Sequence, residues 1–335
     1  MADKAHLQTD LKLEQMEKRL SAIYSVSQRK IQAKMLEFAK SIEPETSELL
    51  KAIKKAKTDE EKNKAKKDYL QYFKKEVLKS KAFKDLSSEI ALDLFDTNTK
   101  ATDYINSQTP EIYALNYNWI NKELSKDIPD FVSQQITAKE AEKYGDLTMQ
   151  TVSKAKDTKW NEDNIKKSVL VGATLLLGAK AIMKRSAKLT VEKNRNSASM
   201  HNSGMGTDAE NKARLDGMYW AEYLGNKMHK VWTATLDNRT RHSHASLDGK
   251  EIPLDKIFDN GCSRPRDPNG TPAEICNCRC SLKYVDVGGE RGRTRSARQG
   301  EVTGSYKKSS SFKGTQSVEI PNITYEEFMK WRKTQ

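Results

Sequence analysis

Apolar residues recur at helical spacing over a long stretch near the start of the sequence, three, four or eight positions apart. Residues at these intervals share one face of an α-helix. The pattern therefore predicts one long amphipathic helix that ends at Pro44, either an arm used in assembly or an ordinary helix of a bundle. The residues concerned are Leu13, Met16, Leu20, Ile23, Ile31, Met35 and Phe38.

Further helices are predicted along the middle of the chain. Breaks are expected at Asn106–Pro110, at Pro129 and over residues 194–208, which are rich in Asn, Ser, Gly and Met. The predicted helix over residues 163–185 is apolar on several faces, which favours burial. Its apolar run is shorter than the roughly 20 residues that cross a bilayer, so membrane contact is not expected. The predicted helices cover residues 111–124, 138–155, 163–185 and 209–227.

A lysine-rich segment covers residues 51–84, with thirteen lysines against five acidic residues, in a chain of net charge +13. Leu70, Phe73, Val77 and Leu78 supply an apolar stripe within it. Lysines neutralise phosphates without reading sequence, so these helices either face DNA or are simply solvated. The charge of the whole chain favours nucleic acid as a partner, ahead of an anionic membrane or an acidic protein.

The pattern changes to short strands and turns from residue 231 to residue 286. Asp248-Gly249 predicts a two-residue hairpin turn between Ser246-Leu247 and Glu251-Ile252. Residues 280–287 predict a closing strand. Near the end of the chain, Thr324 and Glu327 predict a capping box that begins a short helix.

The fold class predicted from these features is mostly α, with long N-terminal helices and a small α+β C-terminal module. We expect a helical N-terminal region (1–145), a short-stranded hairpin module (146–287) and a basic tail (288–335). The tail is of low complexity, which is typical of a flexible segment.

All four cysteines lie in the late module. This clustering suits a local site in a reducing compartment better than a secreted disulfide framework. If residues 276–280 are extended, Cys276, Cys278 and Cys280 share one face of the strand. His242 and His244 share a face under the same assumption.

A structural zinc ion needs four nitrogen or sulfur ligands, and this module is small enough to benefit from one. A catalytic zinc would also need a base, for which Asp237 or Glu274 could be nominated. Packing of the thiols in the core and a disulfide stay open as alternatives. The preferred ligands are His244, Cys262, Cys278 and Cys280, with Cys276 and His242 as alternatives.

An ordered set of motifs resembles the phage minor head protein family named after protein F of phage Mu. Residues 231–249 hold a Trp, an Asp-x-Arg-Thr-Arg, a His three residues on and a Leu-Asp-Gly turn. A Pro-Arg-Asp-Pro loop (265–268) and an Asn-Cys-Arg-Cys sequence (277–280) follow. Cys262 and Cys276 depart from the family pattern. The matching residues are Trp232, Asp237, Arg239, Arg241, His244, Leu247, Asp248, Gly249, Asn277, Cys278, Arg279 and Cys280.

The resemblance implies that residues 146–287 are a head morphogenesis domain. It implies a minor capsid protein of the virion, inside the phage head near the portal, which passes through the host cytoplasm during assembly. The implied roles are head morphogenesis, DNA packaging or DNA ejection. The implied partners are the portal protein, a major capsid or scaffolding protein and double-stranded DNA bound without sequence preference, with no small-molecule substrate.

Several motif residues have two interpretations. Trp232 either packs in the core or stacks on a base. Asp237, Arg239 and Arg241 either form an ion-pair network that holds the turn, or an Arg contacts phosphate. The basic tail supplies the DNA-binding candidates Arg291, Arg293, Arg295, Arg298, Lys307 and Lys308.

The sequence has no Gly-x4-Gly-Lys-Ser/Thr loop, no His-Glu-x2-His and no Gly-x-Ser-x-Gly. We therefore expect a structural protein without catalytic residues. Two alternatives remain: a metal-dependent hydrolase or a toxin delivered with phage DNA, and a cellular zinc protein that binds nucleic acid.

Overall fold

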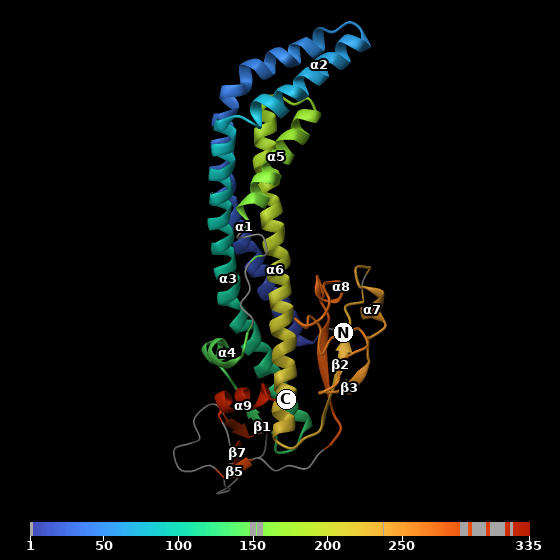
Figure 1. Cartoon of the computed structure of the whole chain (residues 1–335). Coiled ribbons are helices and arrows are strands. Elements are labelled where there is room, and N and C mark those ends of the chain that lie inside the picture. The colour runs from blue at the N-terminus through green and yellow to red at the C-terminus, as the bar shows by residue number, and fades with distance from the viewer. Residues whose placement is uncertain are drawn as a thin grey trace. The chain divides into compact units, whose positions relative to one another are not determined.

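A computed structural model describes residues 3–147, 152, 157–236, 238–288, 294–296, 306–308, 319–321 and 324–335. The described backbone is mainly helical, with a small three-stranded antiparallel sheet late in the chain (Figure 1). The predicted fold class is therefore confirmed.

The residues form two compact units, each built from segments that are distant in sequence. The helical unit comprises Met16–Tyr104 and Gln150–His201. The sheet unit comprises Met1–Gln15, Ile105–Met149 and Asn202–Gln335. These units divide the chain differently from the three predicted regions, whose boundaries stay a prediction.

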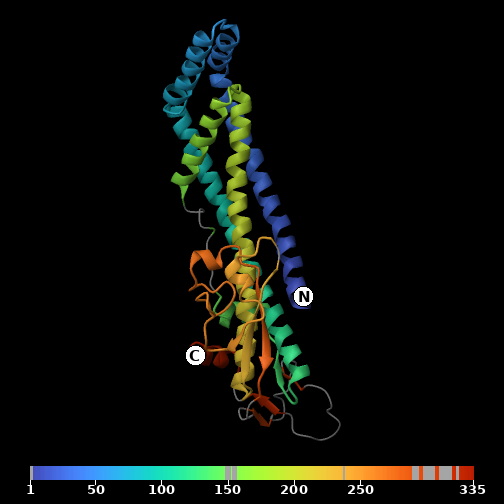
Figure 2. The same ribbon diagram turned by 90° about the vertical axis from the view of Figure 1, so that its right-hand side faces the viewer.

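Long helices supply most of the helical unit, and three of them, α1, α3 and α6, contribute residues to the sheet unit as well. Thr58 begins α2 with a capping box that includes Glu61. The end of α5 and the start of α6 form a helical hairpin (Figure 2), in which Gly172 faces Ile182 closely. The helices are α1 (Lys4–Lys55), α2 (Asp59–Tyr72), a π-helical turn (Phe73–Val77), α3 (Lys81–Asp127), α5 (Thr158–Thr174) and α6 (Ala179–Tyr223).

A chain of buried hydrogen bonds joins four helices of this unit. The Tyr24 hydroxyl of α1 donates to Asn98 Oδ1 of α3 at 2.6 Å. Asn98 Nδ2 donates to Asn194 Oδ1 of α6 at 2.8 Å, and Asn194 Nδ2 donates to Asn161 Oδ1 of α5 at 2.9 Å. All four side chains are buried. Such a satisfied polar network fixes the relative register of the helices, because any slip leaves buried groups unpaired.

Two predicted helix ends are wrong. Pro44 lies inside α1 and Pro110 lies inside α3. A proline removes one helical hydrogen bond and costs ~3 kcal/mol or more within a helix. Here the buried face continues past each proline, with Thr46 in α1 and Ile112 in α3 buried. Packing of a long face therefore outweighs the local penalty.

The predicted loop over residues 194–208 is also wrong, because these residues are the middle of α6. Asn194 and Asn202 are buried and hydrogen-bonded, as in the Asn202 Nδ2 bond to the Leu13 carbonyl, whereas Asn196 is exposed. Its glycines allow close packing: a Cβ on Gly204 would collide with Arg266, and one on Gly206 would collide with Leu13.

The predicted helix 163–185 is two helices. α5 ends at Thr174 and α6 begins at Ala179, with Leu176 at a positive φ of 55° in the turn. The prediction of burial on all sides is wrong for Val171 and Leu175, which are exposed.

The other predicted helix ends lie closer to the ends in the structure. α3 ends before Pro129, and α6 ends at Tyr223 just before Gly225, which has a positive φ of 96°. Of the helix predicted over residues 138–155, the structure has α4 (Ala138–Tyr144), and residues 148–151 and 153–156 lie outside the described part.

The three-stranded sheet has the order β3-β2-β4, with antiparallel neighbours. Side chains of β2 alternate between buried and half-buried. The strands are β2 (Met228–Thr233), β3 (Glu251–Pro253) and β4 (Ser281–Asp286). The last confirms the predicted closing strand.

The predicted two-residue hairpin at Asp248-Gly249 is wrong. Ser246 and Leu247 follow a short helix, and the strand that pairs with β3 is β2. Position 249 still favours glycine, because its φ is +75°. The Gly249 N–H donates to the Trp232 carbonyl at 2.8 Å.

The C-terminal helix α9 (Tyr325–Arg332) begins with the predicted capping box of Thr324 and Glu327. Phe328 is fully buried, with its ring 5.1 Å from that of Trp220. Two small antiparallel ladders complete the sheet unit. They pair β1 (Val132–Gln134) with β6 (Tyr306–Lys308) and β5 (Thr294–Ser296) with β7 (Glu319–Pro321). The rest of residues 289–323, where a flexible tail is predicted, lies outside the described residues.

Among the described helices, none combines the length and apolar character that a membrane crossing requires.

Candidate metal centre

Two short helices position the late motifs of the sheet unit. α7 (His242–Ala245) lies in the loop between β2 and β3, and α8 (Pro272–Ile275) lies shortly before β4. The Arg241 guanidinium donates to the Cys276 carbonyl, and the Thr235 hydroxyl donates to the Arg279 carbonyl at 2.7 Å. These bonds hold the loop that contains α7 against the segment that leads into β4.

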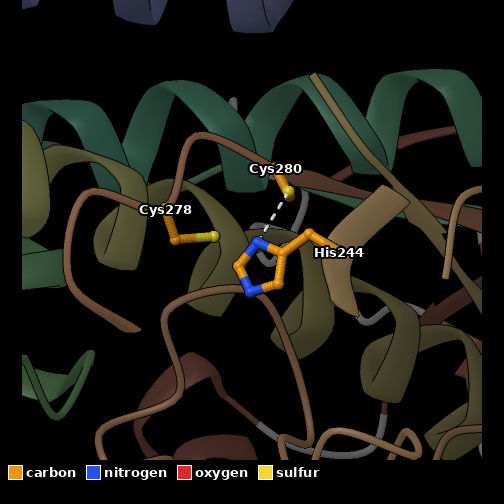
Figure 3. A group of neighbouring side chains, drawn as sticks. All are labelled: His244, Cys278 and Cys280. Carbon is orange, nitrogen blue, oxygen red and sulfur yellow. Dashed lines mark hydrogen bonds between the residues drawn. The ribbon is translucent and has the colours of Figure 1, made fainter. Parts of the chain in front are cut away.

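His244, Cys278 and Cys280 converge in this place (Figure 3). One ligand atom of each lies within 4.8 Å of the others, and all three residues are buried. Cys280 Sγ is 3.5 Å from His244 Nδ1, and the Cys278 side chain also points toward the imidazole. Three of the four preferred zinc ligands are therefore brought together.

Asn211 of α6 fixes the backbone of Cys280. Its Nδ2 donates to the Cys280 carbonyl at 3.0 Å, and its Oδ1 accepts from the Leu282 N–H at 2.8 Å. Asn211 itself is fully buried. No local pattern indicates this contact, because an Asn in a helix is usually a surface residue.

The His244 ring is held from its other sides. It packs edge-on against Trp232, with ring centroids 5.3 Å apart. His244 Nε2 lies 3.0 Å from Glu274 Oε2, although no hydrogen bond forms between them. The Glu274 carboxylate accepts from the Ser243 hydroxyl and from Asn260 Nδ2, each at 3.1 Å.

The three residues of the cluster shift one another's pKa values. A hydrogen bond from Cys278, together with His244, lowers the pKa of the Cys280 thiol. The hydrogen bond to Cys280 and burial raise the pKa of Cys278. The hydrogen bond to Cys280 raises the pKa of His244. A negative charge on Cys280 is thus stabilised at this position, which is what a metal ligand requires.

The remaining candidate ligands lie elsewhere. Cys262 is buried outside the cluster, with Sγ 4.0 Å from the Asn260 carbonyl, and burial raises its pKa to about 11. Cys276 and His242 are exposed.

The two assumptions about shared faces are wrong. His242 and His244 belong to the helix α7, where residues two apart point in different directions. Cys276 is separated from Cys278 by Asn277 at a positive φ of 56°, and β4 begins only at Ser281. An extended strand from Cys276 to Cys280 therefore does not form.

The other motif residues differ in burial. Trp232 is buried and packs on Phe258 with ring centroids 5.1 Å apart, which agrees with its interpretation as a core residue. Asp248 Oδ1 accepts from the Ala234 N–H at 2.8 Å. Asp237 lies outside the described residues and Arg239 is exposed, so the proposed ion-pair network stays a prediction.

The DNA-binding candidates of the tail are not tested by the structure. Arg291, Arg293 and Arg298 lie outside the described residues, and only the backbone is described for Arg295 in β5 and for Lys307 and Lys308 in β6. In the helical unit, nearly all lysines of residues 51–84 are exposed.

Comparisons with known proteins bear on the same segment. Residues 161–283 match the model of the family described as Phage Mu protein F like protein. This segment runs from α5 into β4 and includes the His244, Cys278 and Cys280 cluster. Through these residues the chain is similar to a phage minor head protein family.

Individual relatives match over shorter segments. The chain is 42% identical over 74 residues to minor head protein GP7 of Bacillus phage SPP1, covering 21% of this chain and 24% of that protein. It is 39% identical over 69 residues to the NAD(+)–arginine ADP-ribosyltransferase EFV of Enterococcus faecalis, covering 20% of this chain and 14% of that protein. No solved structure is significantly similar to the chain.

Proposed function

We propose that this chain is a minor capsid protein of a tailed phage that resides in the virion, inside the head near the portal. The match of residues 161–283 to a minor head protein family carries the proposal, and the SPP1 minor head protein supports it. On this proposal the chain passes through the host cytoplasm during assembly. It acts in head morphogenesis, DNA packaging or DNA ejection by contacting the portal and the major capsid or scaffolding protein.

Non-specific DNA binding is part of the proposal. The net charge of +13 supports it, as do the exposed lysines of residues 51–84 and the basic residues beyond 288. Binding through lysines and arginines to phosphates would be independent of sequence and would weaken steeply with salt.

A second function, that of an enzyme, is favoured by the similarity to an ADP-ribosyltransferase. The shared segment is only 14% of that protein, so the similarity is compatible with a head module joined there to a separate activity. We propose that the present chain acts without catalysis, and that the His244, Cys278 and Cys280 cluster holds a structural zinc ion.

Co-purification tests the head-protein proposal. A tagged full-length chain is co-expressed with the portal protein of the same phage, with a tail protein of that phage as the matched negative control, and purified virions are examined for the chain by mass spectrometry. We expect retention of the portal but not of the tail protein, and the chain in virions. Absence from virions together with no portal retention at low or high salt would contradict the proposal.

A further inference from the structure

We propose that the cluster is a zinc site in which His244 Nδ1, Cys278 and Cys280 are the protein ligands and Glu274 positions the imidazole from outside the metal. This inference deepens the function proposed above by naming how the site is built.

The ligand geometry fits zinc before any metal is added. Tetrahedral coordination with Zn–S of about 2.3 Å and Zn–N of about 2.0–2.1 Å separates a sulfur and a nitrogen ligand by roughly 3.5 Å. Cys280 Sγ and His244 Nδ1 are 3.5 Å apart. Cys278 lies within 4.8 Å of both, so a small movement of its side chain completes a three-ligand set.

The surroundings of His244 identify which nitrogen binds. With Nδ1 on the metal, the proton of the neutral ring resides on Nε2. That atom is buried without a hydrogen-bond partner, yet it lies 3.0 Å from the Glu274 carboxylate. Ligating histidines commonly donate their second N–H to a carboxylate that is itself held by other groups. Ser243 and Asn260 hold Glu274 in that way.

The same residues have two other possible uses, and burial argues against the first of them. Cys280, His244 and Glu274 follow one another as a nucleophile, a base and an orienting carboxylate would. However, the relative exposure of Cys280 is 2%, so a substrate larger than an ion has no direct access to its sulfur. A disulfide between Cys278 and Cys280 would remove both thiolates, and it is an outcome that the experiment below detects.

The zinc ion would join the loop that contains α7 to the residues just before β4. Two thiols lose their protons when the ion binds, and the ligand set then balances the charge of Zn²⁺. Cys262 is not a ligand on this proposal, so the site has three protein ligands, one fewer than a closed structural zinc site. Since the ligand atoms are buried, we expect the ion to be acquired as the module folds.

Metal content and a cobalt spectrum of the full chain test the site. The chain is purified under reducing conditions from zinc-supplemented cells, and we expect about one zinc per chain. Exchange with Co²⁺ should give the charge-transfer bands of two thiolates and the intense visible bands of tetrahedral coordination. This readout needs no variant to fold. A chain without metal, or with an intact mass lowered by a Cys278–Cys280 disulfide, would overturn the proposal.

Variants then separate ligands from neighbours. Cys278→Ser, Cys280→Ser and His244→Asn should each weaken affinity at least tenfold, whereas Cys262→Ser and Cys276→Ser should leave it unchanged. Glu274→Gln should weaken zinc affinity about 10–100-fold without altering the cobalt spectrum. Glu274→Asp, which keeps the carboxylate, should have a zinc affinity between those of Glu274→Gln and the wild type. An altered spectrum in Glu274→Gln would make Glu274 a ligand, and loss of metal in Cys262→Ser would refute the three-ligand set. Because metal content is read without the portal, failure of the site and failure of the head-protein proposal are distinguishable.

Discussion

His6 sits near the start of α1, and its Nδ1 is 2.8 Å from Glu210 Oε1 of α6, within the sheet unit. Arg214 Nη2 is also 2.8 Å from Glu210 Oε1, and the Arg214 side chain is fully buried. Its Nη1 is 2.6 Å from Asp3 Oδ2. The first residues of the chain are thus tied to α6 by a group of partly buried charges.

The pairing with Glu210 predicts a pH dependence of stability. The hydrogen bond to Glu210 raises the pKa of His6 above its ordinary value of 6.5. Since the folded state then binds the proton more tightly than the unfolded state, this contribution is complete below about pH 6.5 and is lost as the pH rises through the raised pKa. Urea unfolding at a series of pH values should show stability falling across that window.

His6→Gln keeps a hydrogen-bonding side chain without the titrating charge, so its unfolding free energy should fall less steeply across the same window. His242→Gln is the matched control, because His242 is exposed, and its slope should equal that of the wild type. Equal slopes for the wild type and His6→Gln would show that the pair does not contribute.

At this scale the sequence could predict which residues carry chemistry but not which of them meet. His244, Cys278 and Cys280 were all candidates, and they converge. Cys262 and Cys276 were equally plausible by residue type. Cys276 is separated from Cys278 by the backbone turn at Asn277, and Cys262 lies outside the cluster. Spacing along the sequence reveals neither fact.

At the scale of elements, the buried hydrogen-bond chain of Tyr24, Asn98, Asn194 and Asn161 should contribute measurably to stability. Asn98→Ala leaves the Tyr24 hydroxyl and Asn194 Oδ1 without their partner. An unsatisfied buried polar group costs about 1–3 kcal/mol, so we expect a loss of at least that size in the free energy of unfolding measured with urea.

The exposed Asn63 of α2 offers the control. Asn63→Ala gains the same helix propensity as Asn98→Ala and breaks no buried bond, so its effect should stay within about 0.5 kcal/mol. If the two variants are equally stable, the chain of hydrogen bonds does not hold the helices together.

The same residues explain where element prediction succeeded and failed. Periodic apolar positions from Leu13 to Phe38 predicted the presence of α1, and the Thr324 and Glu327 pair predicted the start of α9, because both signals are local. Residues 194–208 resemble a loop because Asn and Gly are typical of loops. In the structure these residues instead allow contacts with distant residues, as Gly204 does with Arg266. Tertiary contacts therefore determine the secondary structure of this segment, and no local sequence pattern reveals those contacts.

At the scale of the whole molecule, the charge of +13 does not say which surface meets a polyanion. Two segments compete: the exposed lysines of residues 51–84 and the basic residues of 288–313. Deleting the tail from residue 288 would also remove α9, whose Phe328 is fully buried. Such a deletion would confuse lost binding with lost folding, so substitution within the tail is the sharper test.

Two variants with the same loss of charge separate the surfaces. One replaces the six tail candidates Arg291, Arg293, Arg295, Arg298, Lys307 and Lys308 by Gln. The other replaces six exposed lysines of the helical segment by Gln: Lys62, Lys64, Lys67, Lys74, Lys75 and Lys79. Binding to duplex DNA is measured over a range of salt concentrations, with two unrelated sequences of equal length.

Each phosphate contact contributes about 0.9 to the slope of log K against log salt. If the tail binds DNA, the tail variant should therefore lose up to roughly five units of slope, while the helical variant keeps nearly the wild-type value. The reverse result would assign DNA contact to residues 51–84, since both variants carry the same net charge. A wild-type affinity that is insensitive to salt, or that differs between the two sequences, would contradict binding through phosphates altogether.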